Sequence, residues 1–457
     1  MTPFTPPTIS RFGSKARNRI IMQTIDFPLP AAFLHNMQKM LGSDFESFLA
    51  SYHQPSLRGL RFRDNRLPLP AAELEGQIMY APNAYYLSQH STAGATPLHE
   101  AGAFYIQEPS AMTAAAVLAP TDGDRVLDLC AAPGGKSTQL AMSANLSLLV
   151  ANEPIGNRAQ ILSRNIERMG IANAIVTSAY PDQLAKKWSG FFDKILVDAP
   201  CSGEGMFRKH PETRLEWPEN SPQHCAERQL DILSSAALML REGGRLVYST
   251  CTFNDIENEG VVTAFLAAHP DFQTCAFALP GLPEAPQGYL HLWPHEIQGE
   301  GHFVALFEKI GDAPASVSPP SLPGIDKKTA QQIAAFYDSI GCSRPLLPNA
   351  CLGEKPVILP DTYPDLKGVR VLRAGLHLGE FKGKTFIPDH AAALSIPFDN
   401  TIELDDAQIL SYLHGDVLPC SESLKGFVVL SYKGYQIGFG KASDGMIKNH
   451  YPKGLRK

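Results

Sequence analysis

The nine residues Asp128-Leu-Cys-Ala-Ala-Pro-Gly-Gly-Lys136 connect a short apolar segment, Asp124–Cys130, to a stretch with helical character from Lys136 onward. The adjacent glycines allow the backbone to approach a ligand closely, and the first N–H groups of the following helix are free to bind polar atoms. Because the lysine directly follows the glycines, the turn is neither a dinucleotide-binding G-x-G-x-x-G turn nor a P-loop. A strand, a glycine turn and a helix in this order predict the ligand-binding turn of an α/β fold.

The rest of the middle of the chain continues this alternation of strand and helix. Helix-like stretches such as Asn157–Met169 separate apolar runs, which are Leu146–Glu153, Ala174–Ser178, Asp193–Pro200, Arg245–Cys251 and His302–Ile310. The alternation predicts an α/β fold with a mostly parallel, doubly wound sheet. Ligands bind beyond the carboxyl ends of the strands in such sheets. The glycine turn, Asp198–Cys201 and Ser249–Cys251 are therefore expected to meet in one crevice.

Shifts in composition divide the chain into parts. The first residues are polar and rich in proline, and a Pro/Ser/Gly-rich stretch follows the last apolar run of the α/β pattern. Short alternating apolar segments near the C-terminus predict a β-rich module. The predicted parts are a disordered arm at residues 1–22, an N-terminal region at 23–100, the α/β domain at 101–310, a linker at 311–324 and a C-terminal region at 325–457.

The overall composition is that of a globular protein with a sizeable core, since 44% of the 457 residues are hydrophobic and 19% are charged. No apolar run approaches the roughly 20 residues of a membrane span. The N-terminal residues also lack the apolar core of a secretory signal, so the cytoplasm is the expected location.

The net charge of −6 is distributed unevenly. Residues 425–457 carry six Lys and one Arg against a single acid, Asp444. A second basic cluster consists of Arg208, Lys209, His210 and Arg214. Such patches suit a phosphate-bearing partner, and they are equally compatible with a solvated surface.

Eight cysteines are spread along the chain without a C-x-x-C pair, which argues against a zinc ribbon or a disulfide scaffold. Cys201 and Cys251 differ from the others because they follow neighbouring sheet strands and face the expected crevice. A cysteine reacts as the thiolate, which a nearby cation such as Lys136 or Arg208 would favour. We interpret these two as reactive, and we interpret as packing residues the cysteines at 225, 275, 342, 351 and 420.

An acidic residue, Glu153, ends the second strand of the predicted sheet. Nucleoside-binding α/β folds use an acid at this position to accept hydrogen bonds from ribose hydroxyls. The alternative interpretation is an acid that caps the following helix.

Four separated motifs occur in the order found in one enzyme family. They are Phe104–Met112 (FYIQEPSAM), Asp128–Lys136 (DLCAAPGGK), Asp198–Lys209 (DAPCSGEGMFRK) and Tyr248–Val262 (YSTCTFNDIENEGVV). Together they resemble the RNA 5-methylcytosine methyltransferases of the NOL1/NOP2/Sun family over roughly residues 100–310. Met206–Trp217 and the C-terminal extension most resemble a bacterial branch that acts on RNA of the small ribosomal subunit. The resemblance implies a Rossmann-like S-adenosylmethionine-dependent methyltransferase domain, a small N-terminal RNA-binding domain and a C-terminal PUA-like RNA-binding module.

The resemblance also implies roles by position. Cys251 matches the nucleophile that adds to carbon 6 of cytosine, Cys201 matches the cysteine that releases the product, and Asp198 matches the acid that contacts the base. With Lys136 they are the expected catalytic residues. The expected cofactor-binding residues are Cys130, Ala131, Ala132, Pro133, Gly134, Gly135, Lys136, Glu153, Arg158, Tyr180 and Asp198. The implied substrate is a cytosine in the decoding region of 16S rRNA, within the small ribosomal subunit, and neither a metal nor a membrane is implied.

The chemistry of cytosine agrees with these roles. Carbon 5 is too electron-poor to accept a methyl group directly, and addition of a thiolate at carbon 6 makes it nucleophilic. After transfer, the proton on carbon 5 must leave and the thiol must be eliminated, so a second acid–base group is useful.

Three positions depart from the family's pattern. Tyr180 stands where the family often has an acid that contacts adenine, with Asp182 two residues on, and Tyr180 is expected to stack on the adenine instead. Arg58–Arg66 (RGLRFRDNR) only loosely matches an N-terminal Arg-x-Asn-Thr motif for which RNA contact is expected. His302 stands where the family usually has Phe.

Other functions fit these residues less well. A nicotinamide dehydrogenase would need a G-x-G-x-x-G turn, and a DNA cytosine methyltransferase would use the Pro-Cys cysteine as nucleophile without a partner at Cys251. A catalytically silent RNA-binding ribosome-assembly factor needs no paired thiols. Methylation of tRNA or of another rRNA site remains an alternative substrate.

Overall fold

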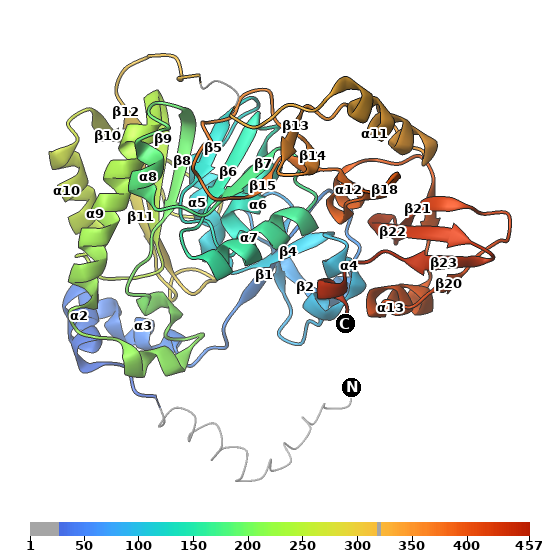
Figure 1. The fold of residues 1–457 in the computed structure, drawn as a ribbon. Helices are drawn as coiled ribbons and strands as arrows, with labels where there is room; N and C mark the ends of the chain where they lie inside the picture. The colour runs from blue at the N-terminus through green and yellow to red at the C-terminus, as the bar shows by residue number, and fades with distance from the viewer. Residues whose placement is uncertain (1–26, 318–320) are drawn as a thin grey trace, which may run out of the picture.

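The computed structural model describes residues 27–317 and 321–457. The arm expected at residues 1–22 lies outside this part of the chain. Figure 1 shows an α/β domain with helices α2 (Ala31–Leu41) and α3 (Phe45–Ser51) at one end and the C-terminal, β-rich part on its other side.

A nine-stranded sheet forms the centre of the α/β domain. In spatial order its strands are β10 (Phe272–Thr274), β12 (His302–Lys309), β9 (Leu240–Thr250), β8 (Phe192–Asp198), β5 (Arg125–Asp128), β6 (Leu148–Asn152), β7 (Ala174–Thr177) and β15 (Val371–Ala374), and β11 (Tyr289–Leu292) also pairs with β12. The five strands from β9 to β7 pair in parallel, whereas the outer strands pair antiparallel. The predicted doubly wound α/β sheet is therefore confirmed. The sheet as a whole is mixed rather than mostly parallel, because its outer strands add as many antiparallel pairings as there are parallel ones in the centre.

Helices cover both faces of this sheet. One face packs against α5 (Thr113–Leu118), α6 (Gly135–Ser143) and α7 (Gly156–Arg168), and the other packs against α8 (Pro181–Ala185), α9 (Ser221–Met239) and α10 (Glu259–Ala268). Successive strand side chains enter opposite layers, as Val126 and Leu127 do. This explains why the central strands are apolar runs without alternation, since both of their faces are buried.

The N-terminal region forms a separate antiparallel sheet. Its strands, in spatial order, are β2 (Leu74–Gln77), β3 (Ala84–Leu87), β1 (Arg58–Phe62) and β4 (Phe104–Gln107). β4 pairs with β1, so residues 104–107 belong to this sheet although the sequence analysis starts the α/β domain at residue 101.

After the predicted linker, the chain forms helix α11 (Lys327–Ser339) and then returns to the central sheet. β13 (Ala350–Leu352), β14 (Lys355–Ile358) and β16 (Leu376–His377) form a small sheet, and β15 pairs with the edge strand β7. Ala350, Val357 and Ala374 join the core of the α/β domain. The region beyond residue 324 therefore completes the methyltransferase sheet, which the sequence pattern did not indicate.

The last residues form a five-stranded sheet with one helix. It is preceded by the hairpin of β17 (Gly379–Lys382) and β18 (Thr385–Pro388) and by the short helix α12 (His390–Ser395). The elements of this C-terminal module are β19 (Thr401–Glu403), α13 (Asp406–His414), β20 (Leu418–Pro419), β21 (Gly426–Tyr432), β22 (Tyr435–Ser443) and β23 (Met446–Asn449). Leu60 and Phe104 of the N-terminal sheet share a core with Tyr412 and Leu430 of the module. No helix in the described ranges has the length and apolar character needed to cross a membrane.

Candidate active site

The two cysteines singled out by the sequence lie side by side. Asp198 and Ser249, at the ends of the neighbouring parallel strands β8 and β9, are in register. The Sγ atoms of Cys201 and Cys251, which follow these ends, are 3.4 Å apart. The adjacent Cys251 thiol and burial raise the pKa of the Cys201 thiol. Cys201 therefore keeps its proton at neutral pH and can donate an S–H hydrogen bond to the Cys251 sulfur.

Two fully buried glutamates hold the loops that carry these cysteines. Glu204, on the Cys201 loop, accepts hydrogen bonds at Oε2 from Thr252 Oγ1 (2.7 Å) and from the Phe253 N–H (2.9 Å). Glu257, after the Cys251 loop, accepts a hydrogen bond at Oε2 from the Ser202 N–H (2.9 Å). Each loop thus binds the other, which fixes the separation of the two sulfur atoms. The sequence analysis missed both glutamates, although both lie within the quoted motifs.

Asp198 is the centre of a polar cluster at the end of β8. Lys136 Nζ lies 2.8 Å from Oδ2, Ser249 Oγ donates to Oδ1 at 2.8 Å, and His302 Nε2 lies 3.6 Å from Oδ1. Burial would raise the pKa of Asp198, but Lys136 and His302 outweigh it and hold the pKa well below its usual range. Asp198 is therefore a carboxylate. Lys136 is the cation paired with this carboxylate.

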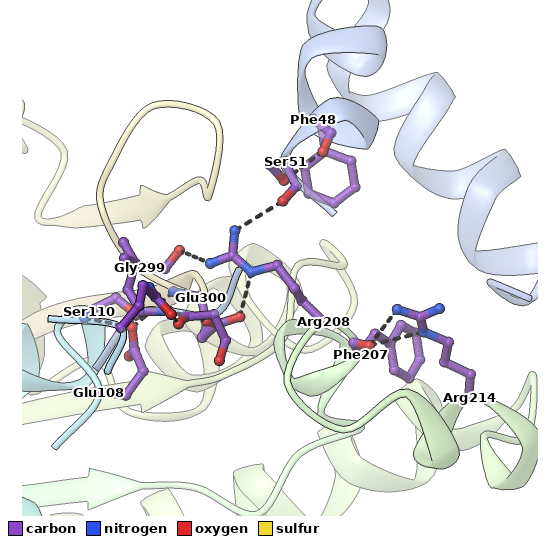
Figure 2. Close-up of polar contacts among 12 residues, drawn as sticks. Phe48, Ser51, Glu108, Ser110, Phe207, Arg208, Arg214, Gly299 and Glu300 are labelled. Carbon is purple, nitrogen blue, oxygen red and sulfur yellow. Dashed lines mark hydrogen bonds and ion pairs between the residues drawn. The ribbon is translucent and has the colours of Figure 1, made fainter. Parts of the chain in front are cut away.

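Arg208 and Arg214, which belong to the basic cluster predicted from the sequence, bind groups of the protein itself, and Arg214 is partly exposed (Figure 2). Arg208 Nε lies 2.7 Å from Glu300 Oε2, and its other two nitrogens donate to the carbonyls of Ser51 (3.2 Å) and Gly299 (2.7 Å). Arg214 donates twice to the carbonyl of Phe207. All three guanidinium nitrogens of Arg208 are engaged by these partners, none of which is a cysteine, so its assistance to a thiolate stays a prediction.

A cavity of about 220 Å³ opens beside the glycine turn. The predicted cofactor residues that line it are Cys130, Ala131, Ala132, Pro133, Gly135, Lys136 and Asp198. The N-terminal sheet supplies a wall that the sequence analysis did not foresee, made of Tyr105, Ile106 and Gln107. The exposed Lys209 also lines the cavity.

The remaining predicted cofactor residues surround the cavity or lie apart from it. Glu153 is buried, and its Oε1 accepts a hydrogen bond from the Ile155 N–H at 3.0 Å, just before α7. Arg158 reaches Glu153 Oε2 at 3.5 Å and donates to the carbonyl of Ala132 at 3.0 Å. Gly134 adopts a φ of +113° at the start of α6. Tyr180 is 64% exposed and does not line the cavity.

Asp128, at the end of β5, is a further cavity residue that the sequence analysis quoted without assigning a role. It is fully buried, and Ser137 Oγ donates to its Oδ2 at 2.6 Å, whereas Oδ1 has no hydrogen-bond partner. Burial raises the pKa of Asp128 to about 7. A buried acceptor without a partner favours a ligand that brings a donor or a positive charge. Within the described ranges, no group of three His, Cys, Asp or Glu residues could hold a metal ion.

Four family models match consecutive parts of the chain. "16S rRNA methyltransferase RsmB/F" matches residues 115–308, and "N-terminal domain of 16S rRNA methyltransferase RsmF" matches residues 29–109. "RsmF rRNA methyltransferase first C-terminal domain" matches residues 350–396, and "Methyltransferase RsmF PUA domain" matches residues 399–457. The matches cover the N-terminal sheet, the α/β domain and the C-terminal parts, and they leave residues 309–349, which include α11, unmatched.

Curated relatives match along almost their whole length. Ribosomal RNA small subunit methyltransferase F of Shewanella piezotolerans is 33% identical over 91% of this chain and 93% of its own. The protein of the same name from Erwinia tasmaniensis is 32% identical over 93% of this chain and 96% of its own.

Solved structures share the fold of the α/β domain. A methyltransferase homologue from Pyrococcus horikoshii is 25% identical, with a TM-score of 0.54 over 64% of this chain and 99% of its own. NSun6 from Pyrococcus horikoshii, solved with SFG, has the same TM-score at 20% identity over 62% of this chain and 99% of its own, and shows the fold alone. On the combined evidence of the family models and the curated relatives, this chain belongs to the RsmF family of 16S ribosomal RNA methyltransferases.

Proposed function

We propose that this enzyme methylates carbon 5 of one cytosine in the decoding region of 16S rRNA, through a covalent bond between Cys251 and the base. The observation that carries the proposal is the pair of thiols 3.4 Å apart beside the Asp198 carboxylate. An RNA methyltransferase that modifies a nitrogen or a ribose hydroxyl needs no such pair, since those atoms are nucleophilic without covalent activation.

The cavity residues fit S-adenosylmethionine. This cofactor supplies an activated methyl group on a positively charged sulfonium. The unpartnered Asp128 Oδ1 offers an acceptor and a negative charge to its cationic end. The turn at residues 130–136 would surround it, with Glu153 near the ribose hydroxyls and Arg158 holding the turn. Tyr180 is proposed to stack on the adenine. Because Tyr180 does not line the cavity, the adenine would have to extend beyond it.

The proposed reaction uses the side chains of Cys251, Asp198 and Cys201 in turn. The Cys251 thiolate forms a bond to carbon 6, and carbon 5 gains the electron density needed to take the methyl group. Asp198 accepts hydrogen bonds from the base edge, and Lys136 keeps that carboxylate ionised. The proton on carbon 5 then passes to solvent water, the bond from carbon 6 to sulfur breaks, and Cys251 departs as a thiolate. An S–H hydrogen bond from Cys201 stabilises the departing sulfur.

Substrate docking is proposed for the regions on either side of the α/β domain. The C-terminal module carries the basic residues of 425–457, and phosphate contacts there would position the RNA while the pocket receives an extruded base. The proposed division of the chain is 23–100, 101–310, 311–324 and 325–457, with RNA contact assigned to the first and last parts. Residues 104–107 join the sheet of the first part, and β15 of the last part joins the sheet of the α/β domain. The small ribosomal subunit is the proposed partner.

The test is transfer of labelled methyl groups from S-adenosylmethionine to purified 16S rRNA and to small ribosomal subunits, followed by nucleoside analysis. We expect 5-methylcytidine at a single position in the decoding region. A different labelled nucleoside would overturn the proposed chemistry, and label in tRNA or 23S rRNA alone would overturn the proposed substrate. Tight rRNA binding without transfer would indicate a ribosome-assembly factor.

Cofactor affinity should rise with pH because of Asp128. Its pKa is raised by burial to about 7, so the side chain becomes anionic as the pH rises through neutrality. Loss of that proton adds negative charge next to a cationic ligand, so binding should be weaker at about pH 6 than at about pH 8. Asp128→Asn should remove this dependence and bind about tenfold more weakly at the higher pH. Calorimetry without RNA measures both, and an unchanged pH slope in Asp128→Asn would rule out this role.

A further inference from the structure

A single arginine of the N-terminal sheet reaches the glycine turn of the methyltransferase domain. Arg61 lies on β1 and is 2% exposed. Its Nη2 donates to the Gly135 carbonyl (2.8 Å) and to Thr138 Oγ1 (2.9 Å), and its Nε donates to Gln107 Oε1 on β4 (3.0 Å). Gly135 and Thr138 form the first turn of α6. One guanidinium therefore connects two strands of the N-terminal sheet to the start of α6.

The two surfaces also touch at the glycine itself. A Cβ atom on Gly135 would lie 3.3 Å from Gln107 Cδ and 3.3 Å from Tyr105 Cε1, so these two side chains of β4 would have to shift by a few tenths of an ångström to admit it. Tyr105 and Gln107 line the same cavity as Gly135 and Lys136. The cavity is thus built at the junction of the N-terminal sheet and the methyltransferase domain rather than within either one.

A buried cation such as Arg61 would be unusual if its only role were packing. In the described part of the chain no carboxylate forms an ion pair with it, and burial lowers its pKa to about 9. Burying a cation without a counter-charge is costly, and apolar side chains usually replace such groups without loss of stability. The planar fork of arginine, however, holds several acceptors at fixed angles, which an apolar side chain or lysine cannot do. The hydrogen bonds of the Arg61 guanidinium go to Gly135 and Thr138 at the start of α6 and to Gln107 on β4.

We propose that Arg61 is a positioning residue of the cofactor site. It holds the first turn of α6 and Gln107 at the separation that leaves the cavity open to S-adenosylmethionine, so the N-terminal sheet forms part of the cofactor site. The Arg58–Arg66 segment therefore acts, at Arg61, on cofactor binding rather than by contact with RNA. This inference rests on the proposed function, because it takes the ligand of the cavity to be S-adenosylmethionine.

The test measures cofactor and RNA affinity separately in Arg61→Met and Arg61→Lys. Calorimetry with S-adenosylmethionine should show at least about a tenfold weaker Kd for Arg61→Met, with Arg61→Lys between it and the wild type. The Kd for 16S rRNA should stay within about twofold of the wild type. The matched control is Arg58→Met on the same strand, whose guanidinium binds the carbonyls of Ser88 and Ser91 instead of the turn, and cofactor affinity should not change there.

Four results separate the outcomes. Folded Arg61→Met with wild-type cofactor affinity overturns the inference, and so does a loss of RNA affinity with cofactor binding intact. Should Arg61→Met fail to fold, Arg61→Lys decides, since it keeps the charge and loses the fork, and an unchanged KM for the cofactor in that variant also overturns the inference. Wild-type protein that does not bind S-adenosylmethionine at all would instead refute the proposed function.

Discussion

Cys251→Ala is expected to lower methyl transfer to 16S rRNA by at least about a thousandfold, to the level of the uncatalysed background. Without the thiolate, carbon 5 of cytosine never becomes nucleophilic, so no other residue of the site can replace it. Transfer of label from S-adenosylmethionine in single-turnover experiments measures the effect. Cofactor affinity should be unchanged, because Cys251 does not line the cavity.

The matched control for this prediction is Cys225→Ala. Cys225 is also half-buried, and its sulfur lies 4.0 Å from Ser221 Oγ on α9 rather than at the ends of β8 and β9. Its replacement should leave transfer within about twofold of the wild type. Retained activity in Cys251→Ala together with loss in Cys201→Ala would reverse the two roles, making Cys201 the nucleophile as in DNA cytosine methyltransferases.

Cys201→Ala is expected to trap the enzyme on its substrate. Methyl transfer should occur once, but elimination of Cys251 should slow by about a hundredfold or more, because the S–H group 3.4 Å from the departing sulfur is gone. A protein–RNA band that survives denaturing electrophoresis and carries the methyl label measures the trapped adduct. The same band should be faint for the wild type, in which release is fast.

The double variant Cys201→Ala/Cys251→Ala provides the control, since it should form no adduct at all. An adduct in the double variant would show that another side chain reacts. No adduct in Cys201→Ala, with steady turnover near the wild-type rate, would refute the release role. Glu204 and Glu257 stay in place in both variants, so the loops should keep their conformation.

The elements closest to the cysteines could be predicted because their signals are local. The apolar runs before Asp198 and Cys251 identified parallel strands, and parallel strands end at one edge, so proximity of the two motifs followed. Glu204 and Glu257 could also have been found, because a carboxylate in a loop between two buried apolar strands needs hydrogen-bond donors. The direction of their side chains, across to the other loop, is a property of the folded chain only.

The partners of charged side chains could not be predicted in the same way. A sequence gives the sign of the charge on Arg208 and Arg214 but not whether their donors meet solvent or backbone carbonyls. In the structure both side chains donate to backbone carbonyls. Arg61 is a similar case, since its partners Gly135 and Thr138 lie more than seventy residues along the chain. Tyr180 was expected at the adenine from spacing alone, and it is 64% exposed and outside the cavity, so its contact with adenine stays a prediction.

The pairing of β15 with β7 determines when during translation the central sheet can be completed. β7 ends at Thr177 and β15 begins at Val371, so almost two hundred residues must be translated between them. At about 5–20 residues per second, this takes on the order of ten seconds or more, during which the nascent chain keeps the edge of β7 unpaired. A protein truncated at the 311–324 linker would keep that edge open permanently and would be prone to aggregate. The enzyme therefore reaches its native state late in its own synthesis, after most of its sequence has left the ribosome.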